Sequence, residues 1–390
     1  MSRRIRVVQF VSGLAIGEYN GGGEMFAIRL AQALDPQRFD VAVCAMWAYD
    51  SRIERDWQRT LVEQGVPTYF GTHYRAKFRL DFEMAFATSY RLFRKLRPDI
   101  LNTHTEYPDM VGLAIKLAGG ARIMVRTGHN VIEWPFAPEI ARRLAWLYPL
   151  FCAREVGVSR SVVEILDQHP IARLLHKRAT YIPNAIEPEV LLAQRTNRDM
   201  RAVLGLPKDT PLFGVVGRLS DQKGMPYLIA AMREIRAELP GARLLIVGNG
   251  EKAAELHALV SELGLDNCIT FLGPRTDVAD IVAGLDVFVS SSLWEGLPTV
   301  ILEAMLLGVP VVATNIAGSR DLVIDGQTGL LAPARDSAAL ARMIIRQYQQ
   351  PARAKAMAAA ARTHIEQFTI REVAQAYSEL YTQLCRRAWW

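Results

Sequence analysis

Strand-like and helix-like segments alternate along the whole chain of 390 residues, and this alternation limits the possible folds more than any other feature. Short runs rich in Val, Ile and Leu are separated by longer segments with helical periodicity. Such an alternation is typical of βαβ units, in which crossover helices join parallel strands. The pattern therefore predicts an α/β protein built on parallel sheets.

The alternation runs twice, and each half is long enough to form a domain. Strands are predicted at 6–10, 41–45, 100–102, 123–126, 180–182, 212–216, 243–247, 269–272, 287–290 and 311–314. Helices are predicted at 24–34, 81–96, 107–117, 226–238, 252–263 and 298–307. Ile182-Pro183-Asn184 and Pro188 mark the hinge between the halves. We expect Rossmann-like domains at 1–187 and 188–369, followed by an amphipathic helix at 370–390.

The positive charge of the chain lies in its first half. The chain has 46 Lys and Arg against 40 Asp and Glu, a net charge of +6, and residues 1–187 hold 25 basic and 19 acidic residues. This excess is typical either of an ordinary solvated surface or of a surface that an anionic membrane leaflet attracts. Nucleic acid is not an expected partner, because no recognition module accompanies the basic residues.

The cysteines and the hydropathy indicate a cytoplasmic protein, with peripheral attachment to the inner face of the cell membrane as a further expectation. The four cysteines are far apart and form no CxxC or CxxH motif, which argues against a disulfide framework and against a zinc site. A strand begins within the first ten residues, so no signal peptide is expected. No segment reaches the roughly 18 apolar residues of a membrane-spanning helix.

In the first half, two glycines and two histidines follow predicted strands. Gly22 and Gly23 precede a helix, where backbone amides can approach a phosphate. His104 and His129 follow two neighbouring strands, and ligands bind at the carboxyl ends of strands in open parallel sheets. The alternatives are an ordinary glycine turn and two hydrogen-bonded structural histidines. Neither histidine has a metal-ligand partner at a useful spacing, so no metal is expected.

In the second half, three loops after strands carry candidate donor-binding residues. Arg218 and Lys223 lie between a strand and a helix, where a planar guanidinium and a compact ammonium can both contact a diphosphate. A capped turn with solvent-facing cations is the alternative. The next two loops contain turns that can frame a nucleoside, and their candidate residues are Gly248, Asn249, Gly250, Pro274 and Arg275.

The segment from Ser290 to Glu303 has the most specific pattern. Pro298 is expected as the first residue of a helix that ends before Gly308. Backbone amides at such a helix start bind anions, and the segment 296–300 is expected to supply them. The donor-binding candidates here are Gly296, Leu297, Pro298 and Thr299, of which Pro298 has no amide hydrogen to donate. Glu295 and Glu303 flank this start, and carboxylates beside a phosphate site are explained if they accept hydrogen bonds from a sugar and a ribose. A helix cap with a solvated glutamate is the alternative.

These motifs resemble those of the retaining GT-B glycosyltransferases of family 4, also called group 1 glycosyltransferases. The resemblance covers nearly the whole chain and is most specific at Arg218/Lys223 and at the Glu-x7-Glu spacing of Glu295 and Glu303. Gly22-Gly23-Glu24 and the Ile182-Pro183-Asn184 hinge also fit. The resemblance implies two Rossmann-like domains that face each other across a cleft, with the C-terminal helix returning to the N-terminal domain.

The resemblance also implies roles for individual residues. Arg218 and Lys223 would neutralise the leaving diphosphate, Glu295 would bind the donor sugar and Glu303 the ribose. The segment 296–300 would cradle phosphates, Gly22 and Gly23 would touch them, His129 would lie near the reacting centre, and His104 would help to place the acceptor.

The activity implied is retaining, metal-independent hexosyl transfer in the synthesis of cell-surface polysaccharide or glycolipid. The donor would be a UDP- or GDP-sugar, used as a co-substrate with no bound cofactor, and the acceptor a glycan or lipid-linked saccharide. An anionic membrane surface is a further candidate partner. Two alternatives remain: a nucleotide-sugar epimerase, and a non-catalytic subunit that binds a sugar nucleotide.

Overall fold

The computed structural model describes residues 3–16, 21–75, 78–132 and 138–389. The chain divides into two compact units, which are described one at a time. Unit 1 comprises residues 1–185 and 370–390, and unit 2 comprises residues 186–369. The boundary expected from the sequence, between residues 187 and 188, lies two residues after the observed boundary between residues 185 and 186.

Unit 1 is a parallel sheet of seven strands in the order β3-β2-β1-β4-β5-β6-β7. Its strands are β1 Ile5–Val11, β2 Phe39–Ala48, β3 Thr68–His73, β4 Ile100–His104, β5 Ile123–Gly128, β6 Arg154–Gly157 and β7 Thr180–Tyr181. Its helices are α1 Gly22–Ala33, α2 Arg52–Glu63, α3 Phe78–Leu96, α4 Glu106–Leu117, α5 Pro138–Phe151, α6 Arg160–Gln168, α7 Pro170–Leu174 and α17 Ile370–Trp389. Every adjacent pair of described strands in this sheet is parallel.

Apolar side chains cover both faces of the unit 1 sheet, as expected for parallel strands with crossover helices. Side chains alternate between the two faces along each strand. Val7 and Val11 of β1 pack in one cluster with residues of α1 and α17, whereas Val8 and Phe10 pack in another cluster with residues of α3 and α4.

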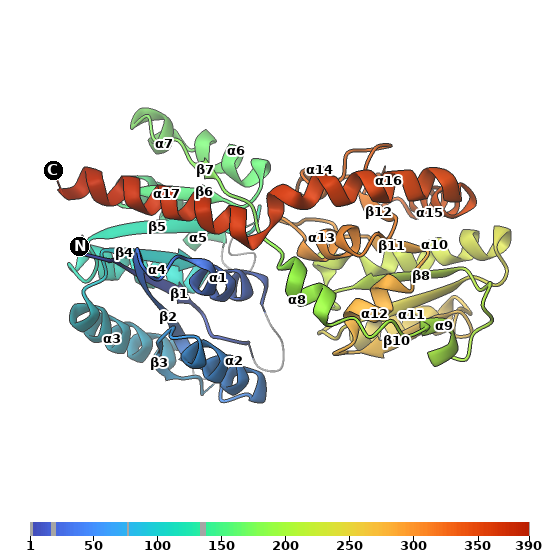
Figure 1. The fold of residues 1–390 in the computed structure, drawn as a ribbon, viewed down its shortest axis with the longest axis horizontal. Coiled ribbons are helices and arrows are strands. Elements are labelled where there is room, and N and C mark those ends of the chain that lie inside the picture. The colour runs from blue at the N-terminus through green and yellow to red at the C-terminus, as the bar shows by residue number, and fades with distance from the viewer. Residues whose placement is uncertain (1–2, 17–20, 76–77, 133–137, 390) are drawn as a thin grey trace. The chain divides into compact units, whose positions relative to one another are not determined.

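The last helix of the chain, α17, packs on unit 1 although unit 2 precedes it in the sequence (Figure 1). Its buried residues recur at helical spacing and join the cluster that contains β1 and α1: Val373, Ala374, Tyr377, Leu380, Tyr381, Leu384 and Cys385. One stripe of an amphipathic helix thus completes the apolar layer over the unit 1 sheet.

Unit 2 is a parallel sheet of six strands in the order β10-β9-β8-β11-β12-β13. Its strands are β8 Leu212–Val216, β9 Arg243–Val247, β10 Ile269–Gly273, β11 Val287–Ser290, β12 Val311–Thr314 and β13 Leu330–Ala332. Its α-helices are α8 Pro188–Ala193, α9 Met200–Val203, α10 Met225–Glu238, α11 Ala253–Glu262, α12 Val278–Ala283, α13 Thr299–Leu306, α14 Ala317–Arg320, α15 Ser337–Gln349 and α16 Pro351–His364. Two short 3₁₀ helices, Asp221–Lys223 and Ile365–Phe368, complete it. Residues of β8, β9 and β11 form a single buried cluster with residues of α10, α11 and α15.

The structure confirms the predicted α/β fold with two parallel sheets and a returning C-terminal helix. Three strands escaped the sequence-based prediction: β3, β6 and β13. They are short or only partly buried: β3 lies at an edge of the sheet, β6 begins with the charged Arg154-Glu155, and β13 has three residues. Within the described residues, no helix is both long enough and apolar enough to span a membrane.

Candidate functional site

The strand order reverses direction at one point in each sheet. The chain builds strands outward on one side of β1 or β8, and then crosses to the other side with β4 or β11. The loops that leave the two central strands therefore diverge, and ligands bind in the crevice that forms there, at the carboxyl ends of the strands. Among the predicted site residues, Gly22 and Gly23 follow β1, His104 ends β4, Arg218 and Lys223 follow β8, and Glu295 follows β11.

A buried hydrogen-bonded network lies at the unit 1 switch point and contains both predicted histidines. His104 Nδ1 is 3.0 Å from His129 Nε2, and His104 Nε2 is 2.8 Å from Gln9 Oε1. Asn102 Nδ2 donates to Gln9 Oε1 at 3.0 Å and to the Tyr381 hydroxyl at 2.9 Å. We call this set the unit 1 cluster, and its members are Gln9, Asn102, His104, Thr127, His129, Tyr377 and Tyr381.

Strand register explains why these side chains meet. Gln9 of β1 pairs with Asn102 of β4, so their side chains leave the sheet on the same face. Thr127 of β5 donates to Asn102 Oδ1 at 3.0 Å, and its hydroxyl is also 3.0 Å from that of Tyr377. Buried polar groups need partners, and α17 supplies two tyrosine hydroxyls to this face of the sheet. The predicted end of this strand at residue 102 was wrong, because β4 extends to His104.

Burial keeps both histidines uncharged at neutral pH. It lowers the pKa of His129 to about 4, against a hydrogen bond with the Asn184 side chain that acts to raise it. Burial, together with the nearby His129, lowers the pKa of His104 well below its ordinary 6.5. A neutral imidazole has one donor and one acceptor nitrogen. His104 is fully buried, whereas His129 is partly exposed.

The two predicted glycines at the start of α1 have different surroundings. A Cβ on Gly23 would lie 2.9 Å from Thr105 Cγ2 and 3.2 Å from His129 Cδ2, so glycine permits this close approach. A Cβ on Gly22 would meet nothing within 4 Å in the described part of the chain. The next residue, Glu24, is buried, and burial raises its pKa to about 7.

An ion pair between Lys223 and Glu295 bridges the unit 2 switch point. Lys223 Nζ is 2.6 Å from Glu295 Oε1, and the side chains are 17% and 9% exposed. Ser292 Oγ donates to the same carboxylate oxygen at 2.9 Å, and Gln222 Nε2 donates to the other at 3.1 Å. Lys223 comes from the loop after β8 and Glu295 from the loop after β11. These four residues form the unit 2 cluster.

Arg218 and Arg275 are held by carboxylates outside the unit 2 cluster. Arg218 Nε donates to Glu251 at 3.1 Å, and both side chains are more than half exposed. Arg275 donates to both oxygens of Asp277, at 2.8 and 2.6 Å, and the neighbouring Pro274 is exposed. Exposed ion pairs contribute little to stability, so a ligand phosphate can replace Glu251 beside Arg218 at small cost.

The glycines after β9 allow two loops to touch. A Cβ on Gly248 would lie 2.0 Å from the Gly217 carbonyl oxygen, and φ at Gly248 is +129°. A Cβ on Gly250 would lie 2.4 Å from the Leu219 carbonyl oxygen. The Leu219 amide donates to the Asn249 carbonyl at 2.9 Å, and the Asn249 side chain stays exposed. The segment 248–250 therefore has a structural role beside the predicted nucleoside contact.

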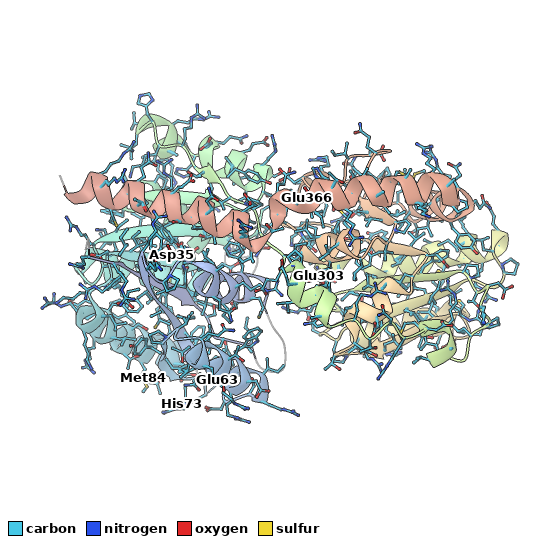
Figure 2. The ribbon with its side chains drawn as sticks, viewed as in Figure 1. Asp35, Glu63, His73, Met84, Glu303 and Glu366 are labelled. Atoms are coloured by element: carbon cyan, nitrogen blue, oxygen red, sulfur yellow. The ribbon has the colours of Figure 1, made fainter. Side chains whose placement is uncertain are left out.

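Helix α13 begins at Thr299, so the prediction that Pro298 is its first helical residue was wrong. Pro298 has a ψ of 101° and is the N-cap, because its carbonyl accepts the first bond, from the Ile301 amide at 3.1 Å. Gly308 follows the helix with a φ of +73°, as predicted. First-turn amides have no partner inside their own helix. Glu303 lies on the same helix, one turn after Thr299 (Figure 2).

Several residues of these clusters were not singled out from the sequence. Gln9, Asn102 and Thr127 were given no role in the site, although polar side chains at matching strand positions were a usable signal. Tyr377 and Tyr381 lie some 250 residues away along the chain from their partners, and no local pattern connects them. Among the described residues, no three His, Cys, Asp or Glu side chains are placed to share a metal ion.

Two family models match the chain, one for each half. The model described as "Glycosyltransferase Family 4" matches residues 20–190, and the model described as "Glycosyl transferases group 1" matches residues 196–364. Together they span most of both units.

Curated relatives match part of the chain. A galactosyltransferase of Escherichia coli named for UDP-Gal and GlcNAc-diphosphoundecaprenol is 28% identical over 66% of this chain and 68% of its own length. A GDP-mannose-dependent phosphatidylinositol monomannoside mannosyltransferase of Corynebacterium glutamicum is 29% identical over the same shares. The lipopolysaccharide core glycosyltransferase LpsE of Rhizobium meliloti is 39% identical over 37% of this chain and 41% of its own length.

Solved structures match nearly the whole chain in fold. Anabaena HepE in complex with UDP-glucose has a TM-score of 0.79 at 23% identity and covers 97% of this chain and 99% of its own. Sucrose-phosphate synthase from Thermosynechococcus elongatus has a TM-score of 0.81 at 23% identity, with 98% and 100% covered. At these identities the likeness shows the fold alone.

Proposed function

Since the chain belongs to glycosyltransferase family 4 and has the GT-B fold, we propose that it transfers a hexose from a UDP- or GDP-sugar to a glycan or lipid-linked acceptor. The ion pair between Lys223 and Glu295 at the unit 2 switch point is the observation that carries this proposal. It puts a cation and a hydrogen-bond acceptor side by side where a nucleotide sugar presents a diphosphate and a hexose.

The unit 2 cluster is suited to stabilise a leaving diphosphate. A lysine ammonium has three donors, so Lys223 can keep its bond to Glu295 and still donate to phosphate oxygens. Arg218 adds a second cation once its exposed partner Glu251 is displaced. The first-turn amides of α13 add the positive end of a helix dipole. Donors fixed in advance stabilise the charge that develops on the phosphate without reorganisation, and this lowers the barrier to departure.

The carboxylates of Glu295 and Glu303 bind the uncharged parts of the donor, which are the hexose and the ribose. Glu295 accepts hydrogen bonds from hexose hydroxyls, and Ser292 and Gln222 fix its orientation. Glu303 accepts from the ribose, and the turns at 248–250 and 274–275 border the base. The relatives named above use UDP-galactose and GDP-mannose, which supports a nucleotide sugar as the donor class.

Transfer proceeds with retention of the anomeric configuration and without a metal. As the bond from the sugar to the diphosphate breaks, positive charge builds on the hexose, and the acceptor oxygen attacks from the face that the diphosphate leaves. The departing phosphate takes the acceptor proton. In this proposal His129 lies near the reacting centre, the bond from His104 orients its ring and so helps to place the acceptor, and Gly22 and Gly23 contribute to phosphate binding. The basic excess of residues 1–187 adds an anionic membrane surface to the proposed partners.

One assay separates transfer from the two alternatives. The full chain is incubated with UDP- and GDP-sugars, with and without a bacterial lipid extract as acceptor, and free nucleotide and products are measured by mass spectrometry. Transfer predicts nucleotide release that depends on the acceptor, together with a glycosylated product. An epimerase instead changes the sugar without an acceptor, and a binding subunit produces neither change. Absence of acceptor-dependent release with every donor, while nucleotide still binds, contradicts the proposal.

A further inference from the structure

A cavity lies between α5 and α6 in unit 1, outside the unit 1 cluster. Its volume is about 250 Å³. Most of its wall is apolar, and the apolar side chains include Val131, Ala145, Pro149, Val162, Ile165 and Leu166. Asn130, which follows His129 in the chain, lies at the same cavity. Part of the cavity wall therefore lies just after the carboxyl end of β5, next to His129 in the chain.

The charged groups at the base of the cavity are already paired with one another. Arg126 donates to Asp109 at 2.9 Å and to Glu155 at 2.8 Å, and all three side chains are almost fully buried. The Arg126 guanidinium also lies over the Tyr148 ring, with its carbon 4.2 Å from the ring centroid. Because these charged side chains already bind one another, they would not bind an added ion strongly. The cavity therefore favours an apolar ligand.

Exposed apolar side chains are concentrated in the part of the chain that forms most of the cavity wall. Of the 17 large apolar side chains that are exposed in the described part of the chain, nine lie between residues 132 and 175. They are Ile132, Ile140, Trp146, Leu147, Leu150, Phe151, Ile165, Leu174 and Leu175. The Trp146 ring is 5.0 Å from that of His169, which lines the cavity. A concentration of this size marks a binding surface rather than scattered exposure.

Basic residues accompany this apolar surface and indicate the chemistry of its occupant. Arg142 lines the cavity and pairs only with the exposed Glu139 among the ion pairs of the described residues. Arg143, Arg173 and Arg178 are exposed on or next to α5 and α7. An apolar cavity beside cations fits a molecule with a hydrocarbon chain and an anionic head.

We propose that the cavity between α5 and α6 binds the hydrocarbon chain of a lipid phosphate acceptor, with Arg142 at its phosphate. The chain end lies among Ala145, Pro149 and Leu166, and the head group points toward Asn130 and His129. This inference rests on the proposed transfer function, and it assigns the acceptor to the lipid-linked class rather than to free glycans.

Binding of two alkyl phosphates to the full chain tests the proposal without catalysis. Dodecyl phosphate and butyl phosphate share a head group and differ in chain length, and titration calorimetry below the micellar concentration measures both dissociation constants. Each methylene removed from water is worth about fourfold in affinity, equivalent to roughly 0.8 kcal/mol. We expect dodecyl phosphate to bind at least tenfold more tightly than butyl phosphate.

Variants of the cavity wall locate the binding. Ala145→Phe fills the cavity, and Ile165→Asp puts a charge at its half-exposed rim, so the experiment does not depend on the folding of one variant. Each should weaken dodecyl phosphate at least tenfold and leave butyl phosphate within twofold. Ala359→Phe, on the exposed face of α16, is the matched control and should change neither. Equal dodecyl affinity in Ala145→Phe and Ala359→Phe would overturn the proposal.

Two further outcomes distinguish binding in the cavity from contact with a bilayer and from the transfer reaction itself. If the wild type sediments with phosphatidylglycerol vesicles but shows no preference for the longer alkyl phosphate, the surface contacts a bilayer and the cavity proposal is wrong. If acceptor-dependent nucleotide release is intact while alkyl preference is absent, this inference fails and the proposed function survives. Alkyl preference without any transfer from UDP- or GDP-sugars leaves a site for an alkyl phosphate, but it overturns the proposed function and with it the role of this site in binding an acceptor.

Discussion

Arg218 and Lys223 carry the same charge in one loop, but the protein holds them in different ways. Lys223 is mostly buried against Glu295, whereas Arg218 is 61% exposed and pairs with an exposed glutamate. Removing one partner of a buried ion pair leaves an uncompensated charge, whereas an exposed pair contributes little. The two cations therefore share a proposed role in catalysis but differ in their contribution to stability.

Alanine variants of the two residues should separate these effects. We expect Lys223→Ala and Arg218→Ala each to lower kcat at least a hundredfold, which is typical when a donor to a developing anion is lost. Lys223→Ala should also lower the free energy of unfolding by about 2 kcal/mol, and Arg218→Ala by less than about 0.5 kcal/mol. Steady-state kinetics and urea denaturation measure both effects. Lys355→Ala, on exposed α16, is the control, and near-wild-type kcat in both variants would remove the diphosphate assignment.

At the residue scale, the sequence predicted which side chains belong to the candidate site better than it predicted which of them contact each other. Glu295 and Lys223 were both expected at the donor site, because each follows a strand of the same sheet. Their direct ion pair depends on the reversal of strand order between β8 and β11, which no local motif encodes. The network around His104 escaped prediction for the same reason: its members are distant in sequence and meet through strand register.

At the scale of elements, the start of α1 combines a packing requirement with a proposed binding surface. Gly23 lies against Thr105 and His129, whereas Gly22 faces space that is open in the described structure. Alanine in the first turn of a helix is otherwise favourable, since glycine costs about 1 kcal/mol relative to alanine inside helices. Any loss of stability when one of these glycines is replaced by alanine is therefore due to the surroundings of that position.

The two glycines make a matched pair of variants. Gly23→Ala should lower stability by about 1–3 kcal/mol and displace His129, because its Cβ would come within 2.9 Å of Thr105. Gly22→Ala should leave stability unchanged or slightly raised, yet raise KM for the donor if Gly22 faces the phosphates. Thermal unfolding and donor-dependent kinetics distinguish the two effects. Unchanged donor KM in a stable Gly22→Ala variant would remove Gly22 from the donor site.

Element boundaries were predictable where periodicity was long and ambiguous where it was short. Helices such as α10 and α13 were predicted to within one residue at each end. Pro298 was misplaced because a proline suits both an N-cap with extended ψ and the first helical residue, and only the carbonyl bond to Ile301 decides between them. The short strand β6 carries two charged residues in four positions, which hides the alternation that reveals a strand.

At the scale of the whole molecule, α17 connects the end of the chain to the interior of unit 1. The sequence predicted an amphipathic helix at this position, but the apolar stripe alone does not say which surface it covers. The structure adds that two tyrosines in the stripe donate or accept hydrogen bonds within the unit 1 cluster. The C-terminal helix therefore supports the histidine pair as well as the apolar core.

Tyrosine variants of α17 should affect unit 1 alone. Tyr381→Phe keeps the ring but removes the hydroxyl that serves Asn102, so a buried amide loses a partner and unit 1 should lose about 1–3 kcal/mol. Tyr377→Ala removes a fully buried ring and should cost about 3–5 kcal/mol. Calorimetry should show the unit 1 transition shifted downward and the unit 2 transition unchanged, with nucleotide binding retained because its proposed contacts lie mainly in unit 2. Tyr348→Ala, whose ring contacts Phe213 in unit 2, is the reciprocal control. If both tyrosine variants shift both transitions equally, the two units do not unfold independently. That result would contradict the expectation that α17 stabilises unit 1 alone.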